Sequence, residues 1–196
     1  MRRCGNPIHT EWVHIAGHLS PEEFWRRIDA GDEQVRGSVG AFPLYGLHGW
    51  TGPVMLGKWQ WENGQVTTAG LVYGTPATEV SVEVVTTVHD PRRRAVTAIE
   101  RAVGVSPADA RCAGHHHRIA RAAAREVQIR VDGRDLIFSA WGGSERWWPA
   151  GTVEGAGIVV QARRYPPDRV VLVAVHDVEP YLSGRRAYLL TVRGGV

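Results

Sequence analysis

Several stretches of this chain have the pattern of apolar and polar residues that predicts β-strands. Residues 55–61 and 65–73 form two such stretches, and the Asn63-Gly64 pair between them supplies the residue types that a tight hairpin turn favours. Residues 79–88 begin with the same alternation and are rich in valine and threonine, which indicates another strand. This part of the chain therefore predicts a hairpin followed by a further strand.

The clearest hairpin comes later, where residues 127–131 and 134–141 flank the Asp132-Gly133 pair. The apolar residues of its two arms share one face across a two-residue turn, so we expect them to enter the core together. These residues are Val127, Ile129, Leu136 and Phe138.

Two more strand-like stretches, residues 158–164 and 169–175, predict a third hairpin across residues 165–168. The near-continuous valines of the second arm favour a central strand that is buried on both faces. Residues 187–192 predict a last strand. Residues 35–53 are rich in glycine and aromatic residues, which is typical of irregular chain or short edge strands.

Helical spacing appears in two regions. Ser20 and Pro21 are favourable residues for a helix start, and we expect this helix to end near Gly31. Its predicted buried face consists of Phe24, Trp25 and Ile28. A second helix is expected from Asp90 to residue 104, and a third from residue 106 to about residue 125.

These elements predict a single α+β domain over residues 1–196, with a mainly antiparallel sheet of six to eight strands and two or three helices. The basic helical segment, residues 91–126, is inserted between strand regions. No apolar run reaches 18 residues, so we expect no membrane-spanning segment. Cys4 and Cys112 alone do not make a disulfide framework, which favours a soluble protein of the reducing cytoplasm.

Positive charge is concentrated in residues 91–130, where nine arginines face three acidic residues and give a net charge of +6. The remaining residues carry a net charge of −3, so this arginine-rich segment is a candidate interaction surface. Four of its arginines would form one stripe on the third predicted helix and could neutralise nucleic-acid phosphates. They are Arg111, Arg118, Arg121 and Arg125.

The same segment holds the best metal-like cluster, in which Cys112, His115 and His116 could share one side of a helix. Thiolate and imidazole suit zinc, but a structural zinc site needs four ligands and the sequence shows no second half. The preferred interpretation is that these histidines are exposed on a basic helix. The sequence therefore identifies no cofactor.

For each candidate catalytic arrangement in the sequence, a purely structural role of the same residues is the preferred interpretation. The stretch Gly52–Lys58 resembles a phosphate-binding loop but lacks the hydroxyl residue that must follow the lysine. The leading expectation is a non-catalytic cytoplasmic binding or accessory protein with a protein partner or self-association. One alternative is nucleic-acid binding through residues 91–130, and another is a small enzyme with a histidine- and cysteine-centred, metal-dependent site.

Overall fold

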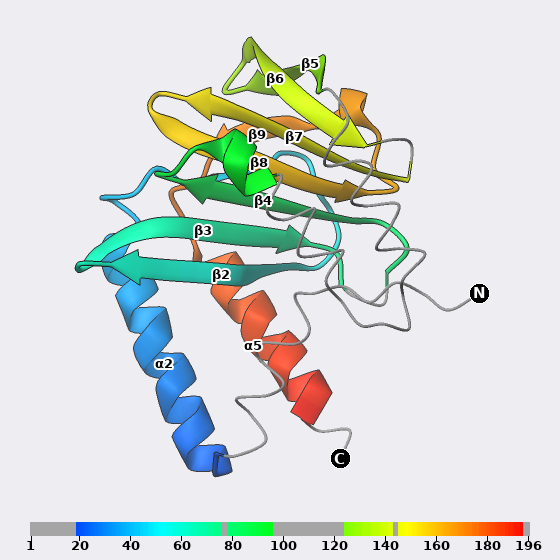
Figure 1. Ribbon diagram of the computed structural model, residues 1–196. Helices are drawn as coiled ribbons and strands as arrows, with labels where there is room; N and C mark the ends of the chain where they lie inside the picture. The colour runs from blue at the N-terminus through cyan, green and yellow to red at the C-terminus, as the bar shows by residue number, and fades with distance from the viewer. Residues whose placement is uncertain (1–18, 76–77, 96–123, 143–144, 194–196) are drawn as a thin grey trace, which may run out of the picture.

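One curled, mainly antiparallel sheet dominates the computed structural model, and two long helices, α2 (Pro21–Ser38) and α5 (Glu179–Arg193), pack beside it (Figure 1). The structure describes residues 19–75, 78–95, 124–142 and 145–193. The strands are β1 (Tyr45–Leu47), β2 (Val54–Glu62), β3 (Gln65–Tyr73), β4 (Ser81–Thr87), β5 (Arg125–Val131), β6 (Arg134–Gly142), β7 (Arg146–Val153), β8 (Ala156–Arg163) and β9 (Val171–Ala174). The predicted fold class is confirmed, with nine strands in the described residues where six to eight were expected.

The strands lie in the order β1-β9-β5-β6-β7-β8-β4-β3-β2. Every neighbouring pair is antiparallel except β5 and β9, which run parallel. The short strand β1 forms one edge, as the glycine-rich sequence before residue 53 predicts. Strand β2 forms the other edge, and helix α5 packs against it.

The two clearest hairpins are confirmed together with their turns. Asn63 and Gly64 join β2 to β3 with φ angles of 52° and 76°, and Asp132 and Gly133 join β5 to β6 with φ angles of 47° and 78°. Two consecutive positive φ angles define the turn type whose twist suits a two-residue hairpin. The register of β5 and β6 places Val127 opposite Phe138 and Ile129 opposite Leu136, so these residues share one face as predicted.

The third predicted hairpin is wrong, although both of its arms are strands. Strand β8 pairs with β7 and β4, whereas β9 pairs with β1 and β5. A 3-10 turn at Pro167–Arg169 separates the two strands and redirects the chain. The expectation that β9 is buried on both faces is also wrong, because Leu172 alone of its four residues is fully buried.

Helix α2 starts as predicted, since the Ser20 hydroxyl accepts a hydrogen bond of 3.2 Å from the Glu23 amide. The predicted end at Gly31 is wrong, because the helix continues to Ser38. The buried residues of α2 recur at helical spacing and include Phe24 and Ile28, while Trp25 is half-buried. Packing of this continuous face outweighs the modest cost of one internal glycine.

Helix α5 occupies the region where a last strand was predicted over residues 187–192, so that prediction is wrong. Leu182, Arg185 and Leu189 are its buried residues near α2, and they recur at intervals of three and four. This spacing puts them on one helical face. Helix α5 runs antiparallel to α2 (Figure 1), and the two are joined by ion pairs from Arg36 to Glu179 and from Arg186 to Asp29.

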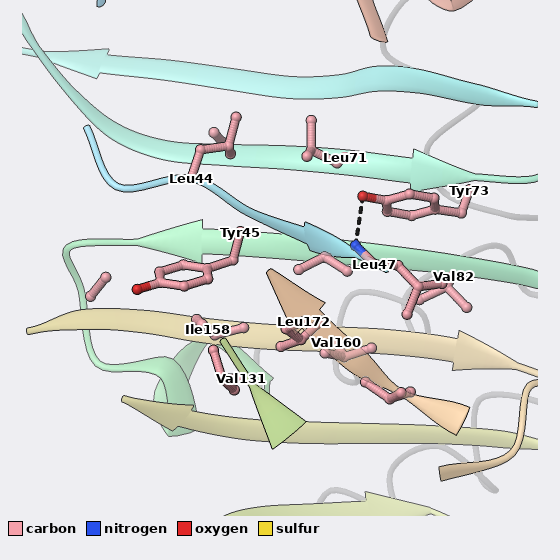
Figure 2. Packing of buried hydrophobic residues seen from close by; sticks show 14 of the residues in the cluster. Leu44, Tyr45, Leu47, Leu71, Tyr73, Val82, Val131, Ile158, Val160 and Leu172 are labelled. Carbon is pink, nitrogen blue, oxygen red and sulfur yellow. Dashed lines mark hydrogen bonds between the residues drawn. The ribbon is translucent and has the colours of Figure 1, made fainter. Parts of the chain in front are cut away.

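The main core lies on the inner face of the curled sheet. Strand β1 crosses this face, because its Tyr45 amide donates to Thr86 Oγ1 at 3.1 Å and its Leu47 amide donates to Tyr73 Oη at 2.7 Å. Figure 2 shows Leu44 and Leu47 packed among Leu71 and the side chains of β8. Of the predicted core residues, Ile129 and Phe138 are fully buried, and Val127 and Leu136 are half-buried against the same cluster.

Candidate functional site on the outer face of the sheet

The opposite face of the sheet, called the outer face below, carries a second and smaller apolar cluster. Its members come from the strands β4, β6, β7 and β8 and from the first turn of a helix at residues 91–95. They are Val85, Ala95, Trp141, Trp148, Ala150 and Val159. Asp90 starts the helical turn as predicted, because its carboxylate accepts a hydrogen bond of 2.9 Å from the Arg92 amide.

A row of polar residues lies beside this cluster on the same face. Arg146 of β7 lies directly opposite Arg163 of β8, and Arg163 lies opposite Ser81 of β4. Side chains alternate between the two faces of a strand, so Arg146 shares the face of Trp148, and Arg163 shares that of Val159. The outer face therefore presents a row of three hydrogen-bonding side chains across three adjacent strands, which we call the Ser81–Arg163–Arg146 row.

The two arginines of this row are a like-charge pair. Directly opposed residues on antiparallel strands have Cβ atoms only about 5 Å apart, and like charges in that position destabilise the sheet. Arg146 and Arg163 are both half-buried. Burial lowers the pKa of Arg146, the charge of Arg163 lowers it further, and Glu145 partly compensates. A guanidinium stays protonated in proteins, so the row holds two full positive charges.

No carboxylate of the described residues forms an ion pair or hydrogen bond with Arg146 or Arg163. The acids at this end of the sheet are instead bound by the next residue along the chain. Arg164 lies 3.3 Å from Glu79 and 3.7 Å from Glu145 through its two terminal nitrogens. The positive φ of 50° at Arg164 marks the point where the backbone turns away from the strand. Arg163 and Arg164 are therefore neighbours in sequence with opposite electrostatic environments.

A second unusual group on the outer face is the carboxyl of Glu83 on β4, which is only 8% exposed. Burial raises its pKa above the ordinary range, although the charges of Lys58 and Arg94 act in the opposite direction. Gly70 of β3 makes room for it, because a Cβ at that position would lie 3.0 Å from Glu83 Oε1. Among the described residues, none donates a hydrogen bond to this carboxyl.

The site residues expected from the sequence are mostly outside the described residues. This holds for Cys112, His115 and His116 and for the arginines Arg111, Arg118 and Arg121. Arg125 is described, and it is the exposed first residue of β5, opposite Ala140. The predicted basic helical segment is therefore wrong at its end, since residues 125 and 126 are in a strand and Arg125 is not part of a helical stripe.

Within the described ranges, no three histidine, cysteine, aspartate or glutamate side chains gather in a way that could hold a metal ion. In the same ranges, no helix is long and apolar enough to cross a membrane. Comparison with protein-family models, with curated proteins and with solved structures returns no match. The fold defines an α+β protein with one curled, mainly antiparallel sheet.

The Ser81–Arg163–Arg146 row was not predicted from the sequence, because strand β7 was not predicted. Pro149 lies inside that strand, and proline is usually confined to edge strands or bulges. The turn residues Glu154 and Gly155, with φ angles of 49° and 85°, join β7 to β8 as a two-residue hairpin. Gly155 was the residue in the sequence that could have indicated this turn. A two-residue turn at Glu154-Gly155 would have placed Arg146 opposite Arg163.

Proposed function

We propose that this protein is a non-catalytic cytoplasmic binding protein that holds an anionic group of its partner between Arg146 and Arg163. The observation that supports the proposal is the like-charge pair itself. Two opposed arginines without an acidic partner among the described residues reduce the stability of the unliganded fold. A bound anion would remove this repulsion and turn it into attraction.

The chemistry of the two side chains suits anion binding. Each guanidinium presents a planar set of N–H donors that matches the oxygens of a carboxylate or a phosphate. Half-burial of the pair lowers the effective dielectric constant around it, and this strengthens its attraction to an anion compared with fully exposed charges. The hydroxyl of Ser81 stands in register beside Arg163 and can supply one more hydrogen bond.

The test is thermal unfolding of the full chain in sodium phosphate and in sodium chloride of equal ionic strength. For a Kd of about 100 μM, about 10 mM phosphate stabilises the protein by about 2.7 kcal/mol. For a chain of this size, that corresponds to a rise in melting temperature of roughly 5–11 °C. The rise should disappear in Arg146→Gln and in Arg163→Gln.

Arg164→Gln is the matched control, because Arg164 lies in the same region of the fold but is already paired with Glu79 and Glu145. This variant should keep the phosphate-dependent rise. Equal melting temperatures of the wild-type protein in the two salts would show that the proposal is wrong. An equal loss in all three variants would show that the effect comes from general surface charge.

A further inference from the structure

We infer that the group held by the Ser81–Arg163–Arg146 row is a phosphate monoester, bound as a dianion. This inference rests on the proposed function and adds the chemical class of the ligand. It is carried by the number and arrangement of the donors and by the charges that surround them.

The donors come from three adjacent strands in one line. Arg163 is the central residue, with Arg146 in register on one side and Ser81 in register on the other. A phosphate monoester has three strong acceptor oxygens in a tetrahedral arrangement. One oxygen can face each of the three side chains, whereas a planar carboxylate has only two oxygens to share among them.

Charge favours the same ligand. The row holds two positive charges: no described carboxylate forms an ion pair with either arginine, and Glu145 compensates Arg146 only in part. At neutral pH a phosphate monoester has a charge between about −1.5 and −2, because its second pKa is about 6. A carboxylate, a sulfate ester and each phosphodiester of a nucleic acid all have a single negative charge. A monoester is therefore the group that neutralises both arginines at once.

The surroundings of the row oppose an extended polyanion. Glu79 and Glu145 are 79% and 81% exposed, and they lie at Arg164, which follows Arg163 directly in sequence. A nucleic-acid backbone lying across the row would bring several phosphates near these two carboxylates, whereas a single terminal phosphate brings only one. The half-burial of both arginines also suits a compact group that approaches end-on.

Two sources present such a group, a phosphorylated serine of a protein and the phosphate of a small molecule. Both share the chemistry that the row would recognise. Titration calorimetry of the full chain with blocked phosphoserine (N-acetyl, N-methylamide) and with ribose 5-phosphate separates them. The source with the higher affinity is the closer mimic of the ligand, and equal affinities mean that the phosphate group alone is recognised.

The decisive comparison uses the sulfate ester of the same blocked serine, which has the same shape and one charge fewer. At pH 7.5 the Kd of the phosphate ester should be at least about tenfold lower than that of the sulfate ester. Its affinity should fall as the pH is lowered to 5.5, because the ester takes up a proton near pH 6. The sulfate ester should show no such fall, so it also controls for titration of the protein.

Variants test the residues of the row. Arg146→Gln and Arg163→Gln should each reduce the affinity for the phosphate ester to that of the sulfate ester or below. Ser81→Ala should weaken binding by roughly tenfold to a hundredfold, the usual effect of one hydrogen bond to a charged group. Arg164→Gln should bind as the wild type does, and melting curves of all four variants confirm that they are folded.

The outcomes distinguish the inference from the proposed function. Equal affinities for the phosphate and sulfate esters would overturn the inference but leave an anion-binding protein. Binding of neither ester would overturn both. Tighter binding of a random DNA duplex, lost in Arg146→Gln, would also overturn the inference, because it would show that the row binds phosphodiesters of a polyanion.

Discussion

Asp32 of α2 and Arg185 of α5 form an ion pair in which both side chains are almost completely buried. Removing Asp32 takes away the carboxylate that pairs with a buried guanidinium, so Asp32→Ala should lower the free energy of unfolding by about 3–5 kcal/mol. Chemical denaturation at pH 7 measures this loss. The exposed pair between Arg186 and Asp29 joins the same two helices and is the control. Asp29→Ala should cost at most about 1 kcal/mol.

The same pair allows a sharper test with a double variant. If both partners are replaced by apolar residues, as in Asp32→Leu with Arg185→Met, the desolvation cost of the two charges disappears. The double variant should then be about as stable as the wild type, or more stable by roughly 1–4 kcal/mol. A double variant that is as unstable as Asp32→Ala would mean that the pair makes specific contacts that apolar side chains cannot replace.

Phe138 and Ile137 are neighbours on β6 with opposite environments, 1% and 63% exposed. Phe138→Ala should cost about 3–5 kcal/mol, because it leaves a cavity in the main core. Ile137→Ala should change stability by less than about 0.5 kcal/mol, as expected for an exposed side chain. The ring of Phe138 also lies against the backbone of Gly151, so Gly151→Ala should destabilise the protein by forcing the ring to move. Similar losses for Phe138→Ala and Ile137→Ala would contradict the assignment of faces.

Gly184 of α5 and Gly31 of α2 are both helical glycines, but their surroundings predict opposite effects of alanine. A Cβ at position 184 would overlap the carbonyl oxygen of Val54, where α5 meets the edge strand β2. Gly184→Ala should therefore separate helix and strand and lower the melting temperature. No atom lies within 4 Å of a Cβ at position 31, so Gly31→Ala should raise stability by about 0.5–1 kcal/mol. Thermal unfolding of the two variants makes this comparison directly.

Glu83 should make stability depend on pH. Burial raises its pKa above the ordinary value of 4.5, so at neutral pH the buried carboxylate opposes folding. The stability that its protonated form contributes is present below the unfolded-state pKa and is lost as the pH rises through the folded-state pKa. Glu83→Gln should accordingly raise the free energy of unfolding at pH 7 and change it little at about pH 4. The exposed Glu126 of β5 is the control, and Glu126→Gln should change stability by less than about 0.5 kcal/mol.

The like-charge pair of the proposed site should cost stability when no anion is bound. Replacing Arg163 by glutamine removes the repulsion with Arg146, so the variant should be more stable by roughly 0.2–1 kcal/mol in buffer without multivalent anions. The same substitution should abolish stabilisation by phosphate. Gain of stability together with loss of binding is the expected combination for a residue kept for function. A destabilised Arg163→Gln variant would show that Arg163 supports the fold.

Local structure was predictable wherever a few adjacent residues determine it. The Asn63-Gly64 and Asp132-Gly133 turns need positive φ angles, and these residue types tolerate them, so both hairpins followed from the sequence, together with the register of β5 and β6. The start of α2 also followed, because Ser20 caps the helix through a contact only three residues away. The α+β class and the mainly antiparallel sheet follow from the sum of these local patterns.

Tertiary structure alone decided how distant segments pair. Strand β9 lies between β1 and β5, two strands that are distant from it in the sequence, and this position buries Leu172 in the core. The residues next to β9 do not indicate this pairing. Residues 187–192 are helical despite their β-branched and aromatic content, because Leu189 packs with Phe24 and Ile28 of α2. Arg146 and Arg163 are brought together only by the pairing of β7 with β8, which Pro149 concealed. Pairing energies of this kind depend on burial and cross-strand neighbours, and these exist only once the whole sheet has formed.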